Sequence, residues 1–275
     1  MTKKVDKYWD KFFKELDLKY VNALFKLSDI DEELIEELPS EYTSISEVER
    51  RADLVAKSKN GYIVDVEYEK KVPTEDTFFK SWDYCCRIYK EHRIKIKNYM
   101  FCVEDLTEEH HDFKPMCGGH HRIYLISLKN IDANKEINII KNKIKNNEKL
   151  DNHNIAFLMC AIFTSYECEP HEMLMEVAKL TNKTQKEDET SLIDKKTLNE
   201  IKYYQINNCE NLIDDDYQKE ILEEIKMKHE FYDNVAAENY EKAQRKIAKN
   251  LKEKGLSLEF IHDTTKLPIE QIKTL

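Results

Sequence analysis

Four acidic side chains lie close together in a segment with the pattern of a β-hairpin. The flanking runs are rich in β-branched and aromatic residues that alternate with polar ones, as in strands with two different faces. The turn signal Asn60-Gly61 stands between the runs, and the acids are Asp53, Asp65, Glu67 and Glu69. Carboxylates gathered on one strand face supply the oxygen ligands that hard divalent cations prefer. The pattern therefore indicates a metal site of the kind that hydrolyses phosphodiester bonds.

The length of the hairpin loop decides which acids face each other. A two-residue loop would set Leu54 opposite Glu67 and mix apolar with acidic side chains on one face. A three-residue loop over 59–61, with Gly61 in the left-handed conformation, sets Asp53 opposite Glu67 and separates the two kinds. The core face is then made of Leu54, Ala56, Val64, Val66 and Tyr68. We predict the three-residue loop.

Carboxylates opposed in this way repel each other, and something must offset the cost. Directly opposed residues have Cβ atoms about 4.5–5.5 Å apart. At an effective dielectric of about 20, two charges at about 4 Å repel by roughly 4 kcal/mol. A bound Mg²⁺ or Mn²⁺ is the simplest remedy, since Mg²⁺ commonly uses one or two carboxylates plus waters and a substrate phosphate. The alternative is an exposed face whose charges are solvated or paired with Lys57, Lys70 and Lys71.

The hairpin resembles the core motif of the PD-(D/E)XK nuclease superfamily. In that motif an aspartate opens one strand and an acidic-x-lysine triplet stands on the next. The segment from Arg51 to Glu69 most resembles the recombination-promoting nuclease group, also called PD-(D/E)XK nuclease family transposases, with its Arg-x-x-Asp-Leu-like opening and Glu-x-Gln ending. On that pattern Asp53 takes the place of the first acid, Glu67 of the second and Glu69 of the lysine or glutamine.

The resemblance implies a Mg²⁺- or Mn²⁺-dependent DNA endonuclease. Asp53 and Glu67 would hold the metal, Asp65 would be a further ligand, and Glu69 would complete the metal sphere or activate water. A lysine at position 69 would stabilise phosphate charge, whereas glutamate accepts a proton or helps to hold metal. Lys57, on the facing strand, is a candidate for a relocated cation. The alternative is a catalytically degenerate nuclease-like protein that binds nucleic acid or a protein partner through its helical half.

The remaining sequence predicts an α/β fold, and the resemblance implies a restriction-endonuclease-like mixed sheet flanked by helices. A mostly helical C-terminal half follows. We expect three parts: a nuclease-like core over 1–130, a helical extension over 131–253 and a helix-turn-helix-like segment over 254–275. Helices are predicted over 5–27 with an interruption near Asp17, and over 31–38, 78–89, 155–166, 171–180, 198–206 and 217–253. Strands are predicted over 99–103 and 122–128.

Composition restricts the partners and the compartment. The longest apolar run, 155–163, is far shorter than the roughly 20 residues that cross a bilayer, and the N-terminus carries no apolar signal region. We therefore expect a cytoplasmic protein without a membrane partner, and seven cysteines that are reduced thiols. No glycine-rich phosphate loop, nucleophile elbow or dinucleotide fingerprint is present in the sequence, which sets aside the classes that use them.

A net charge of −10 argues against bulk electrostatic coating of DNA, so DNA contacts must be local. One candidate is the basic segment after the hairpin, whose cations either approach the substrate backbone or are simply solvated: Arg87, Lys90, Arg93, Lys95 and Lys97. Another is the C-terminal pair of short helices, which start at Ser257 and Pro268 and serve either DNA contact or packing. The charged helical half is a candidate surface for a homo-oligomer.

A run of histidine and cysteine invites a zinc interpretation. It comprises His110, His111, Cys117, His120 and His121. Cys and His at short spacing supply tetrahedral zinc sites, but this spacing is not that of a standard finger. Two glycines within the run favour a loop between strands equally well.

Overall fold

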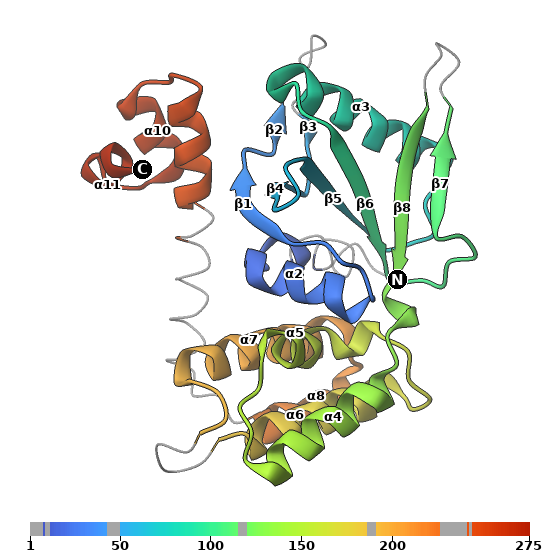
Figure 1. Cartoon of the computed structure of the whole chain (residues 1–275). Coiled ribbons are helices and arrows are strands. Elements are labelled where there is room, and N and C mark those ends of the chain that lie inside the picture. Colours follow the sequence, from blue (N-terminus) through green and yellow to red (C-terminus); the bar gives the residue numbers. More distant parts are fainter. Residues whose placement is uncertain are drawn as a thin grey trace. The chain divides into compact units, whose positions relative to one another are not determined.

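The structure is a computed structural model that describes residue 8 and residues 12–42, 50–114, 120–185, 191–225, 241 and 244–275. The chain forms two compact units, Met1–Lys226 and Met227–Leu275 (Figure 1). The boundaries predicted at residues 130 and 253 remain predictions.

A six-stranded mixed sheet forms the centre of the first unit, in the order β1-β4-β5-β6-β8-β7. Its strands are β1 Leu34–Leu38, β4 Leu54–Ser58, β5 Ile63–Glu69, β6 Ile96–Cys102, β7 His110–Phe113 and β8 His121–Ser127. Strands β5, β6 and β8 run parallel, whereas β1, β4 and β7 pair antiparallel with their neighbours. Strands β2 (Glu41–Tyr42) and β3 (Arg50–Arg51) form a separate pair. The predicted α/β class with a mixed sheet is confirmed.

Helices cover both faces of this sheet: α2 (Leu18–Leu27) and α3 (Glu75–His92). From α3, the Ser81 hydroxyl donates a hydrogen bond to Asn98 Oδ1 at 2.7 Å. From α2, the ring of Phe25 meets the ring of Tyr99 edge-on, with centroids 5.0 Å apart. Asn98 and Tyr99 are neighbours on β6 and so point to opposite faces. The sheet is therefore enclosed between these two helices.

The helical half of the first unit follows the last strand. It contains short 3₁₀ turns over Leu128–Asn130 and Ala161–Phe163, with α4 Ala133–Asn146, α5 Asn152–Cys160, α6 Pro170–Lys183, α7 Lys195–Leu212 and α8 Asp215–Ile225. Every residue of α5 from Asn154 to Cys160 is buried, as expected for a helix that is apolar all round. In the parts of the chain that the structure describes, no helix is long and apolar enough to cross a membrane.

The second unit has a small apolar core of its own. Residues 244–253 are helical, and α10 (Leu258–Thr265) and α11 (Ile269–Thr274) follow. The buried side chains are Ala248, Ile261, Leu267 and Ile272. The Ser257 side chain caps α10 by accepting a hydrogen bond from Phe260 N at 3.2 Å, and Pro268 precedes α11. The two predicted start positions are confirmed.

The predicted hairpin register is also confirmed. Leu54 pairs with Val66, and Ser58 N donates to Tyr62 O at 2.8 Å, which leaves a three-residue loop. Gly61 has φ +81°, the left-handed conformation that this loop requires. The acidic face, however, is not open to solvent. Val55 of the same face is buried in a core with residues of α3.

The prediction of a helix over 31–38 is wrong, because this segment contains β1. Leu34 and Leu38 are both buried and are four residues apart, a spacing typical of a helix face. In the structure the pairing of β1 with β4 is irregular between Leu34 and Glu36, and that irregularity breaks the period-two pattern. Helix α4 and strand β7 were not predicted, since α4 lies in a Lys/Asn-rich stretch and β7 in the His-rich run.

Replacing Gly61 with alanine should destabilise the first unit by about 1 kcal/mol, because an L-residue is strained in the left-handed region. A Cβ at this position would meet nothing within 4 Å, so the effect should come from the backbone alone. Urea denaturation measures it. Asparagine tolerates this conformation, so Gly61→Asn should cost less than Gly61→Ala. Equal losses for both variants would contradict the backbone explanation.

Candidate active site

Asp53 and Glu67 meet across the hairpin at the start of β4. Asp53 directly precedes β4, and extending the observed pairing by one residue sets it opposite Glu67. Asp53 N lies 3.4 Å from Glu67 Oε1, and Tyr68 N donates to Asp53 Oδ2 at 3.0 Å. The backbones of both strands therefore hold these two carboxylates together, as the sequence predicted for the register.

Asp65 lies deeper on the same face and is fully buried beneath α3. Its Oδ2 accepts hydrogen bonds from Asn98 Nδ2 at 2.7 Å and from the Cys85 thiol at 3.5 Å. Asn98 in turn accepts the hydrogen bond from Ser81. The second oxygen, Oδ1, is buried and has no hydrogen-bond partner within the described ranges. The sequence suggested Asp65, but not the three side chains that surround it.

Burial and mutual repulsion keep protons on this cluster. Burial raises the pKa of Asp65 to about 7, hydrogen bonds from Cys85 and Asn98 oppose the rise, and the charge of Asp53 adds to it. Burial also raises the pKa of Glu67 well above its usual range, and the charges of Asp53, Asp65 and Glu69 raise it further. A cation placed among these carboxylates would relieve the same repulsion and displace the proton.

Glu69 belongs to the cluster through its charge. It ends β5, two residues beyond Glu67 and on the same face, and its repulsion contributes to the raised pKa of Glu67. It is half-buried, unlike the fully covered Asp65. The structure thus brings together Asp53, Asp65, Glu67 and Glu69.

A lysine far away in the sequence supplies a positive charge to this site. Lys14 Nζ lies 2.9 Å from Asp53 Oδ1. No spacing pattern in the sequence links positions 14 and 53, so Lys14 was not found there. Lys57, the predicted candidate for a relocated cation, instead lies 2.8 Å from Glu36 Oε2 on β1. That pairing directs Lys57 toward the neighbouring strand.

The donor set suits a hard cation held by few protein ligands. Within the described ranges, no group of three or more His, Cys, Asp or Glu side chains is arranged as a ready-made metal cage. Mg²⁺ usually binds through one or two carboxylates and keeps several waters for a substrate phosphate to replace. Asp53 and Glu67 are such a pair, and the repulsion around Glu67 is what a cation would offset.

The basic segment that follows the hairpin does not converge on the acids. Arg87 Nη2 lies 2.7 Å from Asp83 Oδ2 on α3 itself. Lys97 points to the opposite face of the sheet, where it contacts Glu32 and Tyr62. Lys90 and Lys95 are exposed. Arg87 and Lys97 are therefore occupied by contacts within the chain.

Two histidines of the proposed zinc run contact other side chains. His111 stacks on Phe78 with ring centroids 3.9 Å apart, and His120 Nε2 lies 3.2 Å from Asp112. Burial lowers the pKa of His121 to about 4, so this histidine is neutral at physiological pH. Cys117 lies outside the described residues. The six cysteines in the described ranges are free thiols, as predicted for them.

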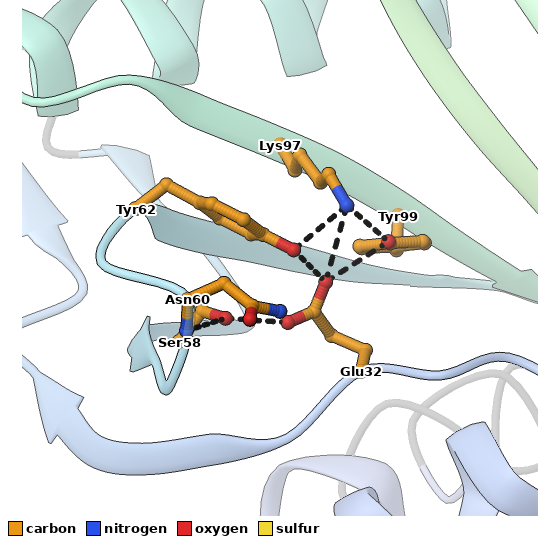
Figure 2. Close-up of polar contacts among 6 residues, drawn as sticks. All are labelled: Glu32, Ser58, Asn60, Tyr62, Lys97 and Tyr99. Atoms are coloured by element: carbon orange, nitrogen blue, oxygen red, sulfur yellow. Dashed lines mark hydrogen bonds and ion pairs between the residues drawn. The ribbon is translucent and has the colours of Figure 1, made fainter.

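A second polar cluster, which the sequence gave no reason to expect, lies at the other end of β5 and on the face covered by α2 (Figure 2). The Glu32 side chain is completely buried there. Its carboxylate accepts hydrogen bonds from Ser58 at 2.6 Å, Tyr62 at 2.5 Å and Tyr99 at 3.1 Å, and Lys97 Nζ lies 3.5 Å away.

Glu32 in this cluster stays ionised despite its burial. Burial alone would raise the pKa of Glu32, but the three hydroxyl donors and the Lys97 ammonium together outweigh it and lower the pKa. Because every oxygen of Glu32 is bonded and its side chain is fully covered, we assign this cluster to fold stability. It fastens the loop before β1 to the hairpin.

No family model, curated protein or solved structure matches this chain. The resemblance to the PD-(D/E)XK superfamily therefore remains a prediction. What the site does has to be argued from its own geometry.

Replacing Glu32 with alanine should destabilise the first unit by about 3 kcal/mol, the lower end of the range for breaking a buried ion pair, because Lys97 is partly exposed. Denaturation in urea measures the loss. Glu36→Ala is the matched control, since it breaks the exposed pair with Lys57 and should cost less than about 1 kcal/mol. Equal losses of stability in the Glu32 and Glu36 variants would contradict the assignment of Glu32 to fold stability.

Stability should fall as pH rises from about 4 to about 7, because the folded protein holds the Asp65 proton that the unfolded chain releases near its usual pKa. Asp65→Asn should make the loss of stability with rising pH smaller. The loss that remains in this variant should come from Glu67, whose pKa is also raised. Urea midpoints measured across this range in EDTA test it. In the control Asp112→Asn the slope should be unchanged, because Arg122 lowers the pKa of Asp112 and its effect lies at lower pH. Parallel wild-type and Asp65→Asn curves would refute the assignment.

Proposed function

We propose that this protein is a divalent-metal-dependent DNA endonuclease with a restriction-endonuclease-like core. The observation that carries the proposal is the pairing of Asp53 with Glu67 across the hairpin, beside two further acids on the same sheet face. The raised pKa of Glu67 supports it, since a site that stores repulsion among carboxylates gains from a bound cation. The resemblance to recombination-promoting nucleases supplies the reaction class.

The roles follow from the position of each group. A bound Mg²⁺ or Mn²⁺ would polarise the phosphoryl oxygen and lower the pKa of a bound water. Asp53 and Glu67 would hold the cation, and Asp65, whose orientation Asn98 and Cys85 fix, would support it from the buried side. The half-buried Glu69 at the end of β5 would accept the proton of the attacking water. The water oxygen bonds to phosphorus while the ester bond breaks, and the leaving oxygen departs with the bonding electron pair and takes a proton from solvent.

DNA contact away from this site would come from the second unit. The C-terminal part of this unit, residues 244–275, contains seven Lys and Arg against four Asp and Glu, although the unit as a whole, residues 227–275, is close to neutral, with nine against eight. Phosphate binding depends on such local excess of cations. The two helices α10 and α11 resemble a helix-turn-helix pair in sequence, and DNA or a second copy of the chain is the partner we propose for this unit.

Glu69 keeps one alternative open. A nuclease-like protein without lysine or glutamine at this position could bind nucleic acid without cutting it. Calorimetry separates the two, because the enzyme must bind Mn²⁺ through Asp53 and Glu67, whereas the binding module need not. Absence of Mn²⁺ binding by the full-length protein would favour the binding module.

Asp53→Asn and Glu67→Gln should each reduce nicking of supercoiled plasmid in Mn²⁺ by at least about 100-fold, since each removes a charged metal ligand without changing side-chain size. Circular dichroism should show that both variants remain folded. The matched control is Glu33→Gln, at the opposite end of the sheet, where Glu33 pairs with Lys59 at 2.8 Å. Its nicking should equal that of the wild type. Full activity in the Asp53 and Glu67 variants would refute the proposal.

A further inference from the structure

Lys14 contacts the carboxylate cluster from an N-terminal segment that packs against β5, the strand that carries Glu67 and Glu69. Phe12 and Phe13 are 1% and 2% exposed. The ring of Phe13 stacks on Tyr68, with centroids 4.6 Å apart. Tyr68 lies between the two glutamates in the sequence of β5, and its side chain is on the opposite face of the sheet. Phe12 packs edge-on against Phe163 at 5.2 Å. These aromatic contacts fix the backbone of Lys14 relative to the site.

The Lys14 side chain is more exposed than the acids that it approaches. The Lys14 side chain is 31% exposed, whereas that of Asp53 is 11% exposed and Asp65 is fully covered. A phosphate that approaches the Asp53–Glu67 pair from solvent would therefore come within reach of Lys14. Its four-carbon stem allows Nζ to move by several ångströms while its backbone stays in place.

The negative charges of the site favour a positively charged side chain close to the bound phosphate. A phosphodiester is negative, and in the reaction it must approach Asp53, Glu67 and Glu69, all of which repel it. Glu69, two residues beyond Glu67 on the same face of β5, adds to the repulsion. One divalent ion held by two carboxylates leaves no net positive charge for the phosphate, so a further cation lowers the barrier.

We propose that Lys14 is the phosphate-binding cation of this site, and this inference rests on the proposed nuclease function. In the free protein Lys14 pairs with Asp53. With DNA bound, Asp53 would hold the metal together with Glu67, and Nζ would turn to a non-bridging oxygen of the scissile phosphate. There it stabilises the negative charge that grows as the water oxygen bonds to phosphorus and the ester bond breaks. Lys14 keeps its proton throughout.

A purely structural counterion for Asp53 is the competing explanation, and three measurements on the full-length protein separate the two. They are plasmid nicking in Mn²⁺, Mn²⁺ affinity by calorimetry, and the salt dependence of binding to a short DNA duplex in Ca²⁺. The variants are Lys14→Met, Lys14→Gln and Lys14→Arg. Lys19→Met is the matched control, because Lys19 pairs with Glu200, 3.7 Å away, on the helical half of the unit.

The Met and Gln variants should lose about 100-fold or more in nicking rate, the usual effect of removing one charge-stabilising donor. Their Mn²⁺ affinity should be unchanged or tighter, because a competing cation has left Asp53. The slope of log affinity against log salt should fall by about one, as for one lost phosphate contact. Lys14→Arg should keep the wild-type slope, and Lys19→Met should behave as wild type. The Gln variant serves if the Met variant does not fold.

The outcomes also separate this inference from the proposed function. If the wild type binds Mn²⁺ and nicks plasmid while the Met and Gln variants nick equally well, the Lys14 assignment is overturned and the nuclease function stands. An unchanged salt slope in the Met and Gln variants would likewise overturn it, even with reduced nicking. If the wild type neither binds Mn²⁺ nor nicks, both proposals fail.

Discussion

Repulsion among carboxylates that share one sheet face is the constraint on which the site depends. Strand pairing and the cover of α3 bring Asp53, Asp65 and Glu67 together. These carboxylates cannot move apart unless the strands separate. The protein offsets the cost in three ways: hydrogen bonds from Asn98 and backbone amides, retained protons, and the ammonium of Lys14. A buried group of acids on this scale is more expensive than apolar packing, which is why we propose a chemical use for it.

Much of this arrangement follows from local sequence. The loop over 59–61 fixes the register because glycine alone adopts its φ without strain, and the register then decides which acids face each other. Helix α3 was predicted from its apolar spacing. The segment of β1 was not, because the acids at its start suit a helix N-terminus, and two leucines four positions apart fit a helix face as well as a strand face. Its pairing with β4 is a non-local contact, and local periodicity carries no information about it.

The partners of the acids could not be predicted for a similar reason. Asn98, Cys85 and Lys14 come from β6, α3 and the N-terminal segment, and each is brought in by the tertiary fold. The buried Glu32 cluster shows the same limit, since Glu32 meets Lys97 across 65 positions. Conversely, Lys57 lies near the acids in sequence and looked suitable, but its strand directs it to Glu36. Proximity along the chain identified the acids, whereas their counterions depend on topology.

The packing of α3 also offers a natural place to observe the site. Successive residues of a helix project about 100° apart, so Cys85 is buried against Asp65 while its neighbour Cys86 faces solvent. A thiol-reactive fluorophore attached to Cys86 would be next in sequence to Cys85, whose thiol contacts Asp65. Since α3 closes the acidic face, such a label would report any movement of that cover when a ligand enters.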